Sequence, residues 1–166
     1  MLTRPCSECG FDAGSLKREQ IGPRLLVAVH DLASALDRPE VRDRPERDVW
    51  SPLEYACHVR DVCRVFDERL VLMLTTQAPL FANWDQDQTA EQERYAAQDP
   101  VTVAGDLLWN ATSLAKRFGA VTGDQWARTG SRSDGAQFTV LTLGQYLVHD
   151  PVHHVYDVTG VRQEGA

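Results

Sequence analysis

The sequence predicts an all-α protein, an antiparallel four-helix bundle with a short irregular N-terminal arm. Apolar residues recur at spacings of three and four in four long segments, which is typical of amphipathic helices. Two connections between these segments are long, and the alternation typical of strands is almost absent. We therefore expect residues 1–14 to form the arm and residues 15–166 to form one bundle domain.

The first two helices are indicated by an apolar stripe and by a capping signal. Residues 15–37 carry a stripe that consists of Ile21, Leu25, Val29, Leu32 and Leu36. The charged segment 38–49, which contains two prolines, is expected to be a loop. Ser51 and Glu54 can form a capping box around a proline at the first helical position, so a second helix is expected to begin here and to end near Thr76.

The last two helices follow a polar and a glycine-rich connection. Residues 77–99 form the polar connection, which has room for a short helical piece, and a third helix opens at Pro100. After the glycine-rich connection, the fourth helix is expected to begin near Thr139 or Thr142. It runs to Thr159, where a glycine ends it.

Composition and charge restrict the classes of partner. The net charge is −7 and the pI about 5.1, which argues against a nucleic-acid partner and favours a small-molecule or protein partner; of these we expect a small-molecule substrate. No apolar run approaches the ~20 residues of a membrane helix, and the N-terminus shows no signal segment. We expect a cytoplasmic protein without a membrane partner, whose four cysteines are reduced.

Three of the five histidines lie in the segment YLVHDPVHHVYD, residues 146–157. His149 and His153 are one helical turn apart on the same face and can bind one divalent ion, but two ligands bind it weakly. His58, at the edge of the apolar face of the second helix, is the candidate third ligand. Three histidines leave a position open, as catalytic sites do; the alternative is three partly buried rings without a metal. His30 and His154 are interpreted as ordinary polar or core residues.

The proline at position 151 lies between the paired histidines and removes one backbone hydrogen bond. The helix either kinks mildly or restarts with Asp150 as its N-cap. In the second case, the geometry of His149 relative to the rest of the helix is less certain.

Several other residues are candidates for a supporting role. Glu54, one turn before His58, is either a catalytic base or orienting group for that histidine or only a capping residue. Asp150, Asp157 and Tyr146 are candidates for orienting the ligands, with a solvated helix position as the alternative. The connection residues Trp84, Asp85 and Asp87 are candidates for the border of the pocket.

Cys6 and Cys9 form a CxxC motif in the N-terminal arm. A four-cysteine zinc site needs a second pair, and Cys57 and Cys63 do not present one helical face. The arm is therefore interpreted as a flexible or docked segment. Metal or redox chemistry at the motif, or a zinc ion shared between two molecules, is the alternative.

These motifs together resemble the DinB-like (YfiT-like) metalloenzyme superfamily over residues 15–160. The resemblance depends on the pattern of Trp50, Glu54 and His58, on the pair His149 and His153, and on the long excursion before the last helix. It implies an up-down-down-up bundle, often a homodimer. It also implies a divalent ion, zinc or nickel, on the three histidines of these motifs. The CxxC arm and the proline at position 151 depart from the family pattern.

Some members of this superfamily are transferases or isomerases that use a low-molecular-weight thiol such as glutathione, bacillithiol or mycothiol. The resemblance therefore implies a metal-dependent thiol S-transferase or isomerase, in which the metal favours the nucleophilic thiolate of the bound thiol. Two alternatives stay open: a catalytically silent metal-binding or stress-related interaction module, and a metal-free helical dimerisation protein.

Overall fold

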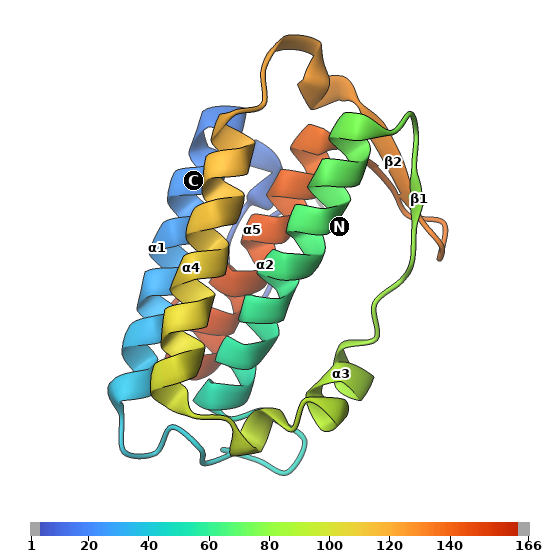
Figure 1. Ribbon diagram of the computed structural model, residues 1–166. Helices are drawn as coiled ribbons and strands as arrows, with labels where there is room; N and C mark the ends of the chain where they lie inside the picture. Colours follow the sequence, from blue (N-terminus) through green and yellow to red (C-terminus); the bar gives the residue numbers. More distant parts are fainter. Residues whose placement is uncertain (1–3, 163–166) are drawn as a thin grey trace.

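The computed structural model describes residues 4–162 and confirms the predicted helical bundle. Four long helices form the bundle: α1 (Ile21–Ser34), α2 (Pro52–Thr75), α4 (Pro100–Gly119) and α5 (Val140–Thr159). In Figure 1, α1 and α5 run in one direction and α2 and α4 in the other. Each of α1 and α2 packs against both α4 and α5, so α1 and α2 lie diagonally across the core.

The helix boundaries follow the capping residues of the sequence. At the start of α2, the Ser51 side chain accepts a hydrogen bond from the Glu54 backbone N–H, and the Glu54 carboxylate accepts one from the Ser51 backbone N–H. Thr139 caps α5 in the same way, and Gly160 ends it at a φ of 71°. Of the two predicted starts of the last helix, the structure has the earlier one.

The first helix is shorter than predicted. Within residues 15–37, only α1 is α-helical, and 3₁₀ turns at Arg18–Gln20 and Ala35–Asp37 flank it. Pro23 lies in the first turn of α1, where the backbone N–H groups have no helical partner and a proline costs little. The proline therefore favours a helix that starts just before it.

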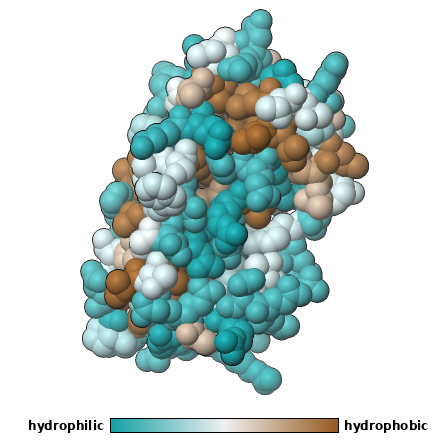
Figure 2. Space-filling view, in the orientation of Figure 1, coloured by the Kyte–Doolittle hydropathy of each residue, from teal (hydrophilic) through white to brown (hydrophobic). Residues whose placement is uncertain are grey.

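A small sheet, which the sequence did not predict, lies beside one end of the bundle, next to α2 and α5 (Figure 1). Strands β1 (Leu80–Phe81) and β2 (Thr129–Arg132) pair in parallel, and β2 pairs antiparallel with β3 (Gln137–Thr139). Strands of two to four residues are too short to display an alternating pattern. Figure 2 shows apolar side chains gathered over this end of the molecule, where Leu72 and Leu80 are exposed.

The connection between α2 and α4 contains β1, the short helix α3 (Gln86–Gln92) and a 3₁₀ turn at Tyr95–Ala97. A buried polar cluster attaches this turn to α2. The Tyr95 hydroxyl donates to Asp61 Oδ2 at 2.6 Å, and the Arg60 guanidinium donates to both carboxylate oxygens at 3.0 Å. Burial raises the pKa of Asp61, but these hydrogen bonds outweigh it and hold that pKa below its ordinary value.

The N-terminal arm is packed onto the bundle rather than extended away from it. Cys9, Phe11 and Ala13 are buried in the same apolar core as the helices. The Gln145 side chain on α5 donates to the carbonyl oxygens of Gly14 and Leu16. The arm therefore covers one face of α5. Within residues 4–162, no helix combines the length and the apolar character that a membrane crossing requires.

Candidate metal centre

His58 lies in α2, one turn beyond the capping box, and its side chain is 1% exposed. Its ring stacks on Trp84, with ring centroids 5.5 Å apart and an interplanar angle of 6°, and Trp50 packs at 5.3 Å. Trp84 belongs to the connection between α2 and α4, so this connection borders the site as expected. Of the other two candidates in the connection, Asp85 caps α3 and Asp87 lines a neighbouring cavity.

Asp150 and His154 on α5 face His58 across the bundle. His58 Nε2 lies 3.5 Å from Asp150 Oδ2 and 3.4 Å from Asp150 Oδ1. His154 Nε2 lies 3.7 Å from the same Oδ1 atom. One ligand atom from each of the three side chains falls within 4.8 Å of the others. Asp150 and His154 are four residues apart, so one turn of α5 places both on the face that meets α2.

The hydrogen bonding and the charge of these three side chains fit a bound cation. Among residues 4–162, Asp150 Oδ1 and His58 Nδ1 are buried and have no hydrogen-bond partner. A buried carboxylate oxygen without a donor is costly, and a divalent ion would satisfy it. Desolvation raises the pKa of Asp150, but His58 and His154 beside it outweigh this effect and lower the pKa to about 2. The carboxylate is therefore anionic at neutral pH.

A further carboxylate orients His154. His154 Nδ1 lies 2.8 Å from Asp157 Oδ2, one turn further along α5. Metal-binding histidines commonly donate their second ring N–H to a carboxylate, which fixes the tautomer and the ring orientation. This contact occupies the Nδ1 atom of His154, so its Nε2 atom faces Asp150. The sequence spacing indicates Asp157 as a support for His153, but its Oδ1 lies 3.7 Å from His153 Nε2 and the shorter contact is with His154.

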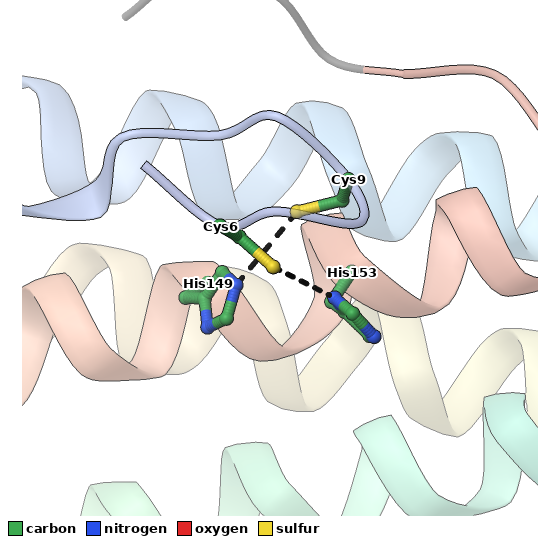
Figure 3. Close-up of side chains that lie close together, drawn as sticks. All are labelled: Cys6, Cys9, His149 and His153. Carbon is green, nitrogen blue, oxygen red and sulfur yellow. Dashed lines mark hydrogen bonds between the residues drawn. The ribbon is translucent and has the colours of Figure 1, made fainter. Parts of the chain in front are cut away.

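The paired histidines of the sequence motif belong to a second group. His149 and His153 face the N-terminal arm, where Cys6 and Cys9 meet them (Figure 3). Cys9 Sγ lies 3.7 Å from His149 Nε2, and Cys6 Sγ lies 3.6 Å from His153 Nδ1.

The two cysteines of this second group differ in their pKa. Burial raises the pKa of the Cys6 thiol, but backbone N–H groups of Cys9 and Glu8 outweigh it and lower the pKa to about 6. Burial raises the pKa of Cys9. The Cys6 sulfur is therefore the one that its surroundings favour as a thiolate.

The structure divides the predicted set of His58, His149 and His153 between the two groups. Among residues 4–162, these three histidines do not form one cluster of ligand atoms. Consecutive helical residues point ~100° apart, so α5 presents two pairs of residues at the same spacing to two different neighbours. The helix runs unbroken through Pro151, which keeps both pairs in register.

Sequence reasoning missed Asp150 and His154 as partners of His58, although a signal was present. The pair Asp150 and His154 has the same spacing as His149 and His153, and a carboxylate is as suitable a ligand as an imidazole. Which pair faces α2 depends on the rotation of α5 about its axis. Packing against α1 and the arm sets that rotation, and the local motif does not contain it.

Glu54 has the position of a capping residue. Its side chain is 4% exposed, and its oxygens accept hydrogen bonds from Ser51 and from the Arg44 guanidinium, the latter at 2.5 and 2.9 Å. Desolvation raises the pKa of Glu54, but Arg44 and Ser51 outweigh it and lower the pKa. Its carboxylate is occupied by these partners, while Tyr146 packs against Phe66 and Phe138, away from the histidines.

A cavity of about 440 Å³ adjoins the centre at the start of α2. Trp50 and Glu54 line it together with Asp87, Arg94 and Tyr95 of the connection. The Trp50 ring lines this cavity and also lies 5.3 Å from the His58 ring, so the cavity adjoins the centre at Trp50.

Fold and site together define a helical-bundle protein with a candidate divalent-metal centre between two facing helices. The model of the DinB superfamily matches residues 24–158, and the chain belongs to this family. Among solved structures, it is similar to YfiT from Bacillus subtilis, described as a probable metal-dependent hydrolase with an unusual four-helix bundle topology. The TM-score is 0.78 at 19% identity, with 88% of this chain and 87% of YfiT covered. No curated protein matches the chain.

Proposed function

We propose that this protein is a divalent-metal-dependent enzyme whose ion is held by His58, Asp150 and His154. The observation that carries the proposal is the buried Asp150 oxygen beside two imidazoles, which has no hydrogen-bond partner in the described part of the chain. Three protein ligands leave a position open, which is the arrangement of catalytic rather than structural sites. Membership of the DinB superfamily and the likeness to YfiT support the same function.

The residues around the centre have distinct tasks in this proposal. Asp157 fixes the tautomer of His154, and Trp50 and Trp84 shield His58 from water. When bound, a divalent ion of zinc or nickel type supplies Lewis acidity and favours the deprotonated form of a bound water or thiol. The substrate is a small molecule that enters beside Trp50.

For the specific reaction we propose transfer of a low-molecular-weight thiol to an electrophilic substrate, or a thiol-dependent isomerisation. The support is the resemblance of the sequence motifs to thiol-dependent members of the superfamily. Hydrolysis is the second candidate, favoured by the description of YfiT. The same resemblance supports a homodimer. A catalytically silent metal-binding module is the outcome if neither reaction is found.

Metal content tests the centre separately from the reaction. Protein purified without a histidine tag is compared with His58→Ala and Asp150→Asn variants, and with His30→Ala as the control because His30 is exposed on α1. We expect His58→Ala and Asp150→Asn to lose bound metal relative to the wild type and His30→Ala to keep it. Equal metal content in all four proteins would contradict the proposed ligands.

Turnover then distinguishes the two reactions. Metal-loaded protein is assayed with several thiols against chlorinated and epoxide acceptors, and with esters and amides without thiol. We expect thiol-dependent product formation that His58→Ala abolishes. Thiol-independent cleavage would identify a hydrolase, and no turnover with metal bound would identify a silent module.

A further inference from the structure

The N-terminal CxxC motif and the last helix meet at a second cluster, which the proposed function does not use. Cys6 and Cys9 approach the bundle from the arm, and His149 and His153 approach from one face of α5 (Figure 3). Cys9 is fully buried, while Cys6 and both histidines are partly buried. The ligand atoms of all four residues lie within 4.8 Å of one another.

Two of the distances between these atoms match the edges of a tetrahedron around zinc. Zinc binds sulfur at about 2.3 Å and imidazole nitrogen at about 2.0–2.1 Å, so tetrahedral geometry sets a sulfur–nitrogen edge of about 3.6 Å. The two sulfur–nitrogen distances are 3.6 Å between Cys6 and His153 and 3.7 Å between Cys9 and His149. In the structure both contacts are sulfur–imidazole hydrogen bonds (Figure 3), and their lengths are also those of two ligands that share an ion.

The backbone around the cysteines is shaped to present both sulfurs. The Gly10 N–H donates to the Cys6 carbonyl at 3.0 Å, and Gly10 has a φ of 81°, which folds the CxxC segment into a tight loop. Backbone N–H groups of Glu8 and Cys9 donate to the Cys6 sulfur, and that of Phe11 donates to the Cys9 sulfur. Such donors stabilise thiolates, the form that binds zinc.

One of the histidines also has the supporting contact of a metal ligand. While His153 Nδ1 faces Cys6, its Nε2 lies 3.2 Å from Glu8 Oε2. A carboxylate on the second ring nitrogen fixes the tautomer that leaves the first nitrogen free to coordinate. Cys6 and His149 also line a cavity of about 520 Å³, which provides an entry path for an ion.

We propose that Cys6, Cys9, His149 and His153 form a closed Cys₂His₂ zinc site, separate from the candidate metal centre. Four protein ligands fill a tetrahedral zinc and leave no open position, so this site is structural. Its task is to fasten the N-terminal arm to α5. Asp150 and His154 alternate with the two histidines along the same helix, so this site lies on the face of α5 next to the one that meets His58.

Cobalt substitution tests this site directly, because a Co²⁺ ion bound by thiolates has a sulfur-to-metal charge-transfer band that a histidine–carboxylate site lacks. Reduced wild-type protein loaded with Co²⁺ is expected to show this band together with the visible bands of tetrahedral cobalt. Zinc is expected to displace the cobalt and remove both. No charge-transfer band in the wild type, or a Cys6–Cys9 disulfide that forms in place of metal binding under reducing conditions, would overturn the proposal.

Variants assign the band to its residues. Cys9→Ser is expected to abolish it, and Cys57→Ser is the matched control, because Cys57 is a buried cysteine of α2 whose contacts with Tyr95 and Gln98 a serine can keep. His58→Ala is expected to retain the band even though it disables the candidate metal centre. The test therefore distinguishes failure of this site from failure of the proposed function. Loss of the band in Cys57→Ser with retention in Cys9→Ser would contradict the assignment.

Discussion

Asp150 is the residue on which the candidate metal centre depends most. Its carboxylate is the only negatively charged member of the three-residue group, and one of its oxygens is buried without a hydrogen-bond partner among the described residues. Placed between His58 and His154, it would neutralise part of the charge of a divalent ion bound there. Asp150→Asn removes the charge of this side chain and keeps its shape, and it therefore tests the role of this residue directly.

The neighbouring histidines His153 and His154 are expected to affect metal binding at two different sites. His154→Ala should weaken binding at the centre with His58 and leave the cobalt–thiolate band intact. His153→Ala should weaken the cysteine site and leave the centre intact, because adjacent residues of α5 face different neighbours. Titration of each variant with cobalt, followed by absorption, measures both effects. Identical losses in the two variants would contradict the division into two groups.

Asp157→Asn tests the orientation of His154. Loss of a carboxylate that supports a metal-binding histidine typically lowers metal affinity about 10–100-fold. We expect a decrease of this order in Asp157→Asn, measured by competition with a chelator of known affinity, because Asp157 lies 2.8 Å from His154 Nδ1. Asp124→Asn, on an exposed 3₁₀ turn, is the control. An unchanged affinity would mean that Asp157 is only a helix-end residue.

At the scale of elements, α5 is the helix that organises the molecule. One of its faces meets α2, another meets the N-terminal arm, and a third lies against α1. Gly144 permits the approach to α1: a Cβ atom there would lie 2.6 Å from Ile21 Cδ1 and 3.0 Å from a Phe118 ring carbon. The absence of a side chain at this position thus sets how closely α1 and α5 pack.

Gly144→Ala is expected to destabilise the protein although alanine is the better helix former. Overpacking of a core costs about 1–3 kcal/mol, which exceeds the gain of about 1 kcal/mol from helix propensity. Gly105→Ala, on α4 with open space around the added Cβ, is the control and should be neutral or stabilising. Urea unfolding of both variants measures the difference. A Gly144→Ala protein as stable as Gly105→Ala would show that α1 moves away at no cost.

The sequence predicted the helices well because their signals are local. The capping box of Ser51 and Glu54 and the glycine after Thr159 fix two helix ends without reference to the rest of the fold. The small sheet was missed because it depends on the contact of residues 80–81 with residues 131–132, about fifty positions away. The ligand groups were missed in part for the same reason, since the rotation of α5 follows from tertiary packing.

At the scale of the whole molecule, the topology requires a long connection, and the fold uses it to cover the site. α2 and α4 are parallel neighbours, so the chain returns along the full length of the bundle between them. On this return it places Trp84 on His58 and Tyr95 on Asp61. The connection thus contributes both to stability and to the environment of the candidate metal centre.

The pH dependence of stability is expected to depend partly on Asp61. Its folded-state pKa lies below the unfolded value of about 3.9, so its contribution is complete above that value and is lost as the pH falls through the folded pKa. Urea unfolding at several pH values should show wild-type stability declining on acidification below about pH 4, with a smaller decline in Asp61→Asn. Equal declines would mean that other carboxylates dominate acid unfolding.

In the proposed metal centre, His58, Asp150 and His154 together hold one divalent ion. Anomalous scattering from crystals of metal-loaded protein tests it most directly, because it locates each ion against its ligands. We predict an ion about 2.0–2.2 Å from His58 Nε2, from an Asp150 oxygen and from His154 Nε2. An ion held instead by His58, His149 and His153, or no ion beside His58, would contradict the account.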